Sequence, residues 1–247
     1  MKNLFVLLFL ISCTAYINAQ ENIKSDFIVI SGIVTDFDKN PIDSAFVEIK
    51  YSDFSTAYET YSDKNGHYEI HVKKGKYLAL ASMKLAEYPL ANSILPKEKQ
   101  RLEFWCWNLI AEENLTINIR YHRMEVYGLN VFRIQGATPG YTIYCRPMSL
   151  TRGFSEPDKN PSQIDLCPNP DELLVSVKIN GNPVNVNMKE KVREYVSEGI
   201  CFAYLFHVDL PEQQGEKLYD ILQIEMLDTK TKDKGEALYF IEKEKYR

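Results

Sequence analysis

The sequence lacks an excess of positive charge, and it contains little glycine or proline. Lys and Arg number 29 against 34 Asp and Glu, so the formal net charge is -5. That balance argues against a nucleic-acid binder held by phosphate contacts, and no nucleic-acid partner is expected. Gly and Pro number 11 each among 247 residues, which excludes collagen-like and linker-like chains. The remaining composition is that of an ordinary globular protein.

Motifs for metal, nucleotide or nucleophilic chemistry are also missing. The four histidines form no H-E-x-x-H pair. His67 and His71 fall in a segment that alternates like a strand, which places their side chains about 13 Å apart, too far to share one zinc ion. No G-x-S-x-G, G-x-x-x-x-G-K or G-x-G-x-x-G motif occurs. We therefore predict no catalytic residue, no metal site and no cofactor, and an unrecognised carboxylate pair of the glycosidase kind stays open.

One acidic segment has part of the spacing of a calcium loop. Asp36, Asp38 and Asn40 match the first ligand positions of an EF-hand. Pro41 and Val47 stand where that loop needs glycine and glutamate. We therefore predict a plain turn, in which the Asp and Asn side chains bond to their own backbone.

The longest apolar run lies at the N-terminus and resembles an export signal. A lysine precedes the apolar residues 4–11, a run far below the roughly 20 residues that cross a bilayer as a helix. Residues 1–19 are predicted to be a signal peptide that is cut after Ala19. The alternative is a lipobox that ends at Cys13, which would then carry a lipid. The expected location is the periplasm or cell surface, or the outer membrane as a lipoprotein, with the lipid as the only membrane contact.

Cysteine is scarce, and its spacing matches no zinc motif. Five cysteines occur, with no C-x-x-C pair among them. Four lie beyond residue 19, and an oxidising compartment would allow three complete pairings of four cysteines. Cys145 and Cys167 bracket a proline-rich loop and are the predicted disulfide candidate. Cys106, between two tryptophans, is predicted to be a buried, small apolar residue.

Residues that favour strands are abundant. The chain has 16 Tyr, 12 Phe and 2 Trp, accompanied by many Val, Ile and Thr. Apolar and polar residues alternate in successive short segments, as in Tyr68, Ile70 and Val72. Turn sequences such as Asn65–Gly66 separate these segments. This pattern is typical of sheets that each bury one face.

The predicted strands fall into two groups. We expect an all-β fold of two tandem β-sandwiches, residues 26–123 and 124–247, the second of them immunoglobulin-like. Two segments depart from the strand pattern. Residues 189–199 are expected to form a short helix, and residues 228–235 are expected to form a charged, solvated hairpin tip.

Residues 28–83 carry short motifs in a fixed order. They are G-I-V-T-D at 32–36, N-P-I at 40–42, A-F-V-E-I at 45–49, S-D-K-N-G-H-Y at 62–68 and G-K-Y at 75–77. This series resembles the carboxypeptidase regulatory-like domain, with Asn40 where glycine is usual. The resemblance implies a transthyretin-like, seven-strand β-sandwich. It also implies a scaffold or binding accessory rather than an active site.

Aromatic residues are densest in Phe104–Trp107. In a strand, Trp105 and Trp107 share one face, and the other two residues share the opposite face. Because both faces are apolar, one interpretation is a strand buried on both sides at the domain interface. A second is an exposed platform for sugar rings, with Trp105, Trp107, Tyr121 and Tyr141 as the ligand-binding residues. Contact with a partner protein is a third.

These observations together favour an exported, non-enzymatic binding or accessory protein of the bacterial cell envelope. A protein–protein adaptor or scaffold is the first hypothesis, with another envelope protein as its partner. A carbohydrate-binding module that recognises a glycan is the first alternative. A hydrolase with an unrecognised carboxylate site is the second alternative.

Overall fold

The computed structural model describes residues 26–90, 94–134, 136, 139–155, 159–196, 198–211 and 216–243. This part of the chain is built mainly from strands, and the predicted all-β fold is confirmed. The predicted signal peptide and Cys13 lie outside the described residues. No helix of the described part is long and apolar enough to cross a membrane. Its short helical pieces are α2 (Leu150–Phe154), η1 (Leu85–Glu87), η2 (Lys97–Lys99) and η3 (Pro161–Gln163).

The first sandwich is formed by the N-terminal half of the chain. Its strands are β1 (Phe27–Thr35), β2 (Phe46–Lys50), β3 (Thr56–Tyr61), β4 (His67–Lys73), β5 (Gly75–Met83), β6 (Phe104–Ala111), β7 (Leu115–Thr116) and β8 (Ile119–Arg120). One sheet has the order β4-β1-β7, and β8 also pairs with β1. Strands β3-β2-β5-β6 form the opposite layer. Strand β4 alternates between exposed and buried residues, as predicted from its sequence.

The second sandwich is formed by the C-terminal half. Its strands are β9 (Met124–Phe132), β10 (Tyr141–Ser149), β11 (Leu173–Ile179), β12 (Asn182–Val184), β13 (Val186–Arg193), β14 (Phe202–Val208), β15 (Tyr219–Asp228) and β16 (Lys234–Glu242). One layer has the order β13-β14-β10-β9, and the other has the order β12-β11-β15-β16. Neighbouring strands within these layers are antiparallel.

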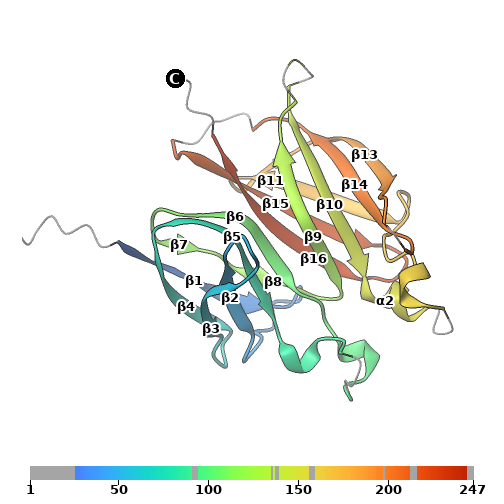
Figure 1. Ribbon diagram of the computed structural model, residues 1–247, viewed down its shortest axis with the longest axis horizontal. Coiled ribbons are helices and arrows are strands. Elements are labelled where there is room, and N and C mark those ends of the chain that lie inside the picture. Colours follow the sequence, from blue (N-terminus) through green and yellow to red (C-terminus); the bar gives the residue numbers. More distant parts are fainter. Residues whose placement is uncertain are drawn as a thin grey trace, which may run out of the picture.

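The two sandwiches are joined through their backbones by β6 and β16, which lie side by side in the centre of Figure 1. These strands pair in parallel, with Ala237 opposite Trp105 and Tyr239 opposite Trp107. The pairing makes one eight-stranded sheet, ordered β12-β11-β15-β16-β6-β5-β2-β3. The sandwiches are therefore tandem in sequence, and one sheet runs through both of them.

Strand β6 is buried on both faces. Phe104 and Cys106 pack in the core of the first sandwich, whereas Trp105 and Trp107 pack in the core of the second. Phe240 of β16 also enters the first core. The interpretation of this segment as an interface strand is confirmed. It follows that the two smaller sheets pack against opposite faces of the eight-stranded sheet.

Gly32 in β1 allows a close backbone approach. A Cβ atom there would lie 2.1 Å from the carbonyl oxygen of Ile117, which also accepts a 2.7 Å hydrogen bond from the Tyr68 hydroxyl. We expect Gly32→Ala to lower the free energy of unfolding by about 2–3 kcal/mol, because the chain between β7 and β8 must move away. Urea denaturation measures this change. Gly153→Ala in α2 is the control: its Cβ would meet only the Leu166 side chain, at 3.3 Å, and helix propensity favours alanine, so stability should change by less than about 1 kcal/mol. Equal losses in both variants would contradict the prediction.

The expected helix at residues 189–199 is wrong. Residues up to Arg193 belong to β13, which pairs along its length with β14. The lysines of this strand reach across to main-chain carbonyl groups: Lys189 Nζ lies 2.8 Å from the oxygen of Leu173, and Lys191 Nζ lies 2.8 Å from that of Cys167. These long-range contacts, together with strand pairing, override the local preference for a helix.

Candidate functional site

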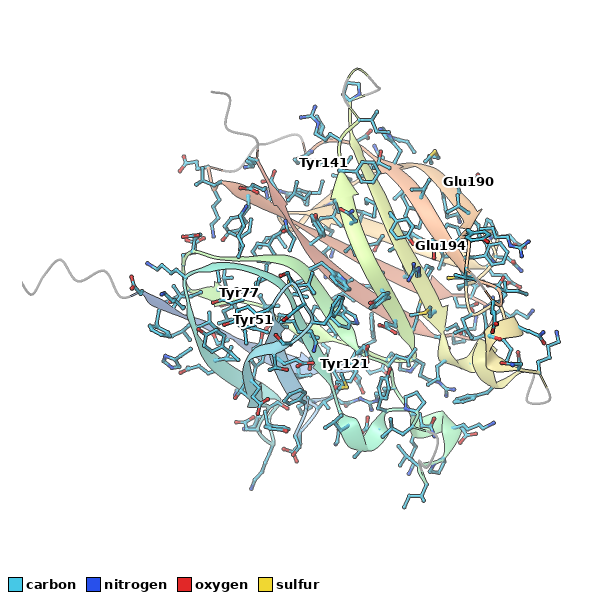
Figure 2. The ribbon with its side chains drawn as sticks, viewed as in Figure 1. Tyr51, Tyr77, Tyr121, Tyr141, Glu190 and Glu194 are labelled. Atoms are coloured by element: carbon cyan, nitrogen blue, oxygen red, sulfur yellow. The ribbon has the colours of Figure 1, made fainter. Side chains whose placement is uncertain are left out.

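The four aromatic residues predicted to bind a ligand are buried. Their exposed fractions are 5% for Trp105, 7% for Trp107, 1% for Tyr121 and 8% for Tyr141. The tryptophan rings stack with centroids 4.6 Å apart, and Tyr127 packs edge-on against both. Tyr121 and Tyr141 lie far apart, in different cores (Figure 2). The predicted exposed platform is therefore wrong, because sheets cover both faces of β6.

The predicted disulfide is also contradicted. Cys145 and Cys167 both lie in the second core, yet each carries a free thiol. Burial raises the pKa of both thiols, that of Cys167 to about 12. Such thiols stay protonated near neutral pH and are poor nucleophiles. Cys106 is buried and free, and its predicted burial is confirmed.

A pair of glutamates, Glu125 buried and Glu103 partly buried, lies where the two sandwiches meet. Glu103 precedes β6 and Glu125 lies in β9, and their carboxyl groups hydrogen-bond to each other. Trp105 Nε1 donates to Glu125 Oε1 at 2.8 Å. Burial, followed by the charge of Glu103, raises the pKa of Glu125 well above its usual range. Glycosidase carboxylates flank a substrate roughly 5–9.5 Å apart, so this contacting pair has a different geometry.

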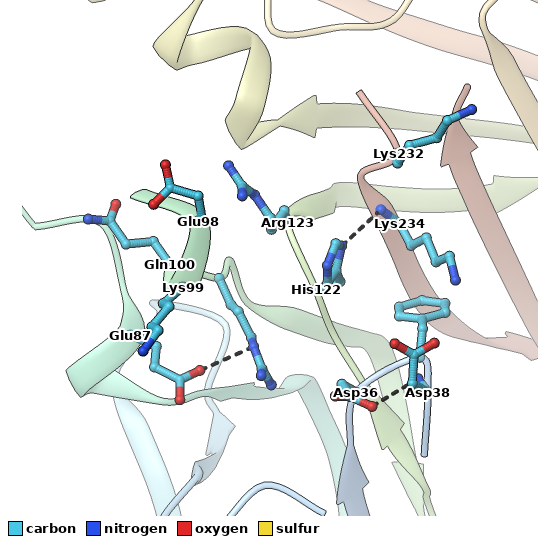
Figure 3. Close-up of a pocket in the computed structure, with 12 residues that line it drawn as sticks. Asp36, Asp38, Glu87, Glu98, Lys99, Gln100, His122, Arg123, Lys232 and Lys234 are labelled. Carbon is cyan, nitrogen blue, oxygen red and sulfur yellow. Dashed lines mark hydrogen bonds and ion pairs between the residues drawn. The ribbon is translucent and has the colours of Figure 1, made fainter. Parts of the chain in front are cut away.

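A polar pocket, here called the junction pocket, lies where four segments of the chain meet. These are the turn after β1, the segment of η1 and η2, the link from β8 to β9, and the hairpin before β16. The pocket has a volume of about 590 Å³. Figure 3 shows its lining residues: Asp36, Phe37, Asp38, Glu87, Glu98, Lys99, Gln100, Arg101, His122, Arg123, Lys232 and Lys234.

Asp36 holds the turn on one side of the junction pocket. Its Oδ1 accepts hydrogen bonds from the backbone N–H of Asp38 at 2.8 Å and of Asn40 at 2.9 Å. Its Oδ2 accepts from the Asn40 amide at 2.9 Å. Burial acts to raise the pKa of Asp36, but these hydrogen bonds outweigh it and the pKa is lowered. The predicted turn is confirmed, and the oxygens of Asp36 are engaged within it.

His122 on the opposite side accepts a hydrogen bond rather than carrying a charge. The backbone N–H of Lys234 points to its Nδ1 at 3.3 Å (Figure 3). Burial lowers the pKa of His122, and the positive charges of Arg101 and Arg123 add to this, while Asp233 opposes it. With Nδ1 accepting, the ring proton sits on Nε2, which leaves His122 a neutral donor.

The hairpin that carries Lys232 is fixed by buried acids. Asp233 Oδ2 accepts from the Ser149 hydroxyl at 2.7 Å and from the Thr151 backbone at 2.9 Å. Asp228 Oδ2 accepts from Arg152 Nε at 2.7 Å. Both acids are essentially inaccessible to solvent. The expectation of a solvated hairpin tip is wrong for these two residues, because α2 and the strand before it supply their partners.

Buried polar atoms without a hydrogen-bonding partner gather around the junction pocket. Six such side-chain atoms occur in the described part of the chain, and the other two are Ser82 Oγ and Trp107 Nε1. Tyr121 does not line the pocket, but the charges of Glu87 and Arg101 act on the pKa of its hydroxyl. Two of these atoms form ion pairs nonetheless: Glu87 Oε2 lies 3.2 Å from Arg101 Nε, and Arg123 Nε lies 3.6 Å from Asp233 Oδ1. The four atoms near the pocket are Glu87 Oε2, Arg101 Nη1, Tyr121 Oη and Arg123 Nε.

No family model and no curated protein matches the chain. Some solved structures do.

The major pilin subunit BcpA of Bacillus cereus is 12% identical with a TM-score of 0.27, over 87% of this chain and 69% of the pilin. A DUF3823 family protein from Parabacteroides merdae is 7% identical with a TM-score of 0.27, over 89% of this chain and 100% of that protein. The major pilin SpaD from Corynebacterium diphtheriae is 9% identical with a TM-score of 0.22, over 85% and 63%. Scores this low transfer no function to this chain.

Sequence reasoning did not find the junction pocket. Its residues come from four segments that carry no common motif, and the tertiary fold alone brings them together. Two signals were present in the sequence: the basic stretch Lys97–Arg101 and the charged segment 228–235. Each is typical of a solvated surface when taken alone. Their convergence depends on how β16 docks against β6.

Proposed function

We propose that the protein is an exported, non-enzymatic binding protein of the bacterial cell envelope, an adaptor or scaffold for another protein. The export signal predicted at residues 1–19 supports the location. The sheet that runs through β6 and β16 supports the role, since it holds the two sandwiches in a fixed arrangement. The junction pocket between them is the proposed binding site.

The observation that carries this proposal is the junction pocket, beside which buried Arg101 Nη1 and Tyr121 Oη have no hydrogen-bonding partner. A buried donor without an acceptor costs about 1–3 kcal/mol, and a partner that supplies the acceptor recovers part of that cost. The side chains of Arg101 and Arg123 remain 26% and 15% exposed at the pocket, where Arg101 is ion-paired with Glu87 and Arg123 with Asp233. The carbohydrate alternative depended on exposed tryptophans, and both tryptophans are buried.

We also propose that residues 28–83 belong to the carboxypeptidase regulatory-like family. Strands β1 to β5 follow the order of the family motifs, and the Asp63–Gly66 turn between β3 and β4 supports the assignment. Gly66 has a φ of 78°, the left-handed conformation that the family's turn glycine suits. This assignment agrees with a binding role, because the family implies no active site.

A photo-crosslinking residue placed at Lys232 tests the proposed site in the producing cell. Lys232 is exposed at the edge of the junction pocket, so a bound partner should give a specific adduct there. The same residue at Lys73 is the control, because Lys73 pairs with Phe27 at the far end of β1. Equal adducts at both positions, or none at Lys232, would refute the proposal.

The mature N-terminus is expected to be Gln20. Cleavage after Ala19 follows from the short apolar run and the small residue before the cut. Intact mass measurement of the protein from the envelope fraction checks this. A diacylated Cys13 at the N-terminus would contradict the prediction and would identify a lipoprotein.

A further inference from the structure

We propose that a second cavity, here called the distal pocket, binds a neutral sugar unit of a glycan. The distal pocket lies where the ends of β9 and β16 meet β6 and the starts of β10 and β15, and its volume is about 610 Å³. Figure 2 labels Tyr141, which lines this pocket, far from Tyr121 beside the junction pocket. The inference goes beyond the proposed function, because it concerns a separate cavity. It involves neither tryptophan.

The distal pocket has an aromatic side with an open ring. Phe132 is 40% exposed, and none of the ring pairs or cation contacts of the described residues involves it. The Tyr239 hydroxyl donates to Asn130 Oδ1 at 3.3 Å, and Asn130 lies on the same face of β9 as Phe132. Two lining rings therefore lie side by side. Sugar rings bind by stacking their C–H groups on such aromatic faces.

A buried carboxylate on the other side of the distal pocket can accept from a sugar hydroxyl. The side chain of Asp220 is 3% exposed and lines the cavity. Its Oδ1 accepts from Asn180 Nδ2 at 2.7 Å and lies 2.9 Å from Lys243 Nζ. Both partners approach Oδ1, so Oδ2 is the oxygen left for a ligand. A hydroxyl that donates to an ionised carboxylate makes a charge-assisted hydrogen bond.

Two uncharged groups add hydrogen-bonding capacity. Tyr141 lines the pocket, and its hydroxyl makes no hydrogen bond within the described part of the chain. Asn108 donates from Nδ2 to the carbonyl oxygen of Phe240 at 2.7 Å, where the backbone pairing of β6 with β16 ends. This bond fixes the amide and leaves its Oδ1 as an acceptor. A hydroxyl that can donate and accept suits a sugar, whose own hydroxyls do both.

The charges of the distal pocket favour a neutral ligand. Asp220 is paired with Lys243, and Glu242 is paired with Lys76. Arg133 is the one further charged residue among the lining residues, and it is exposed to solvent, where water and salt screen it. The acids and bases therefore nearly balance, and an anionic ligand gains little from this pocket. A neutral sugar needs the stacking surface and the polar groups alone.

The test places the fluorescently labelled mature chain on an array of neutral oligosaccharides of glucose, galactose, mannose and N-acetylglucosamine. Oligosaccharides with uronic or sialic acid stand on the same array. We expect binding to a neutral oligosaccharide, for which Phe132→Ala should raise the dissociation constant by about tenfold because the stacking ring is lost. The matched control is Phe54→Ala, which removes a ring that is 46% exposed between β2 and β3 and should leave binding unchanged.

A second variant separates binding from folding. Tyr141→Phe removes a hydroxyl that no described residue uses, so urea unfolding should stay within about 0.5 kcal/mol of the parent. The dissociation constant of the same oligosaccharide should rise by about fivefold, because one hydrogen bond to the ligand is lost. A purely structural role of Tyr141 would change stability and leave the dissociation constant as it is.

Three results would overturn the inference. They are no binding to any neutral oligosaccharide on the array, equal loss of binding in Phe132→Ala and Phe54→Ala, and a preference for the acidic oligosaccharides. The crosslinking residue at Lys232 reports on the junction pocket and not on this one. Adducts at Lys232 without sugar binding would therefore refute this inference and leave the proposed function standing.

Discussion

Replacing Trp107 with alanine is expected to lower the free energy of unfolding by about 3–5 kcal/mol. The Trp107 ring stacks on Trp105 with centroids 4.6 Å apart and meets Tyr127 edge-on at 5.4 Å. Removing it leaves a cavity between two sheets whose backbones are held by strand pairing and cannot close around it. Urea unfolding followed by circular dichroism measures the loss.

The same change should not unfold one sandwich alone. Strand β6 contributes Trp107 to the second core and Phe104 to the first. We therefore expect Trp107→Ala and Phe104→Ala each to shift a single unfolding transition rather than to split it. Tyr61→Ala removes a ring that is 56% exposed and serves as the control, with an expected loss below about 1 kcal/mol. Two separate transitions in Trp107→Ala would show that the sandwiches unfold independently.

The nature of β6 could be read from its sequence because its four leading residues are apolar on both faces. A strand with one solvent-exposed face alternates between polar and apolar residues. Strand β4 does so, with a regular pattern of exposed and buried residues. Phe104–Trp107 has no polar face, so its sequence predicts burial on both sides, and the structure confirms this. Local pattern was sufficient here because burial is a property of each residue's own face.

The partner of β6 could not be read in this way. Strand β16 lies far along the chain, and its parallel pairing with β6 is made by backbone groups that every residue carries. The side-chain pattern therefore predicts that both faces of β6 are buried. It does not identify the strand that pairs with β6. The junction pocket depends on that pairing, because β16 brings Lys234 to the turn that holds Asp36.

Long-range contacts explain the wrong predictions as well. Cys145 and Cys167 do lie in one core, but proximity across a loop does not place two sulfur atoms at bonding distance. The charges of residues 228–235 suggested solvent, yet Asp228 is buried against Arg152 of α2. A sequence shows that a residue is charged, and only the fold shows whether a counter-charge lies beside it.

Stability is expected to fall as the pH rises above about 4.5, the usual carboxyl value, because of Glu103 and Glu125. Both have raised pKa values, chiefly through burial, and the nearby charge of Glu48 adds to the effect on Glu103. The folded protein then holds a proton that the unfolded chain releases. Each pH unit within this window costs up to about 1.4 kcal/mol per proton, and the loss levels off above the folded pKa.

Acidic residues with lowered pKa values affect the stability of the protein in a separate pH range. Hydrogen bonds and ion pairs lower the pKa of Asp36 and of Asp228 against the effect of burial. Their contribution to stability is present above about pH 4, the unfolded value, and is lost as the pH falls further. The decline above pH 4.5 is therefore assigned to acids with raised pKa values, which are the Glu103–Glu125 pair and Glu236, whose pKa is also raised by burial.

Glu125→Gln removes the titratable proton of Glu125 but keeps the hydrogen bonds of its side chain. The glutamine oxygen can still accept from Trp105 Nε1, and its amide can donate to Glu103, so the packing is retained. We expect this variant to be at least ~1 kcal/mol more stable than the parent at pH 8 and to have a flatter pH profile. Urea unfolding between pH 5 and 9 checks it, with Glu190→Gln, an exposed acid on β13, as the control. A Glu125→Gln protein that is less stable at pH 8 and keeps the parent slope would mean that the pair is ionised in the folded state and stabilised by something other than a shared proton.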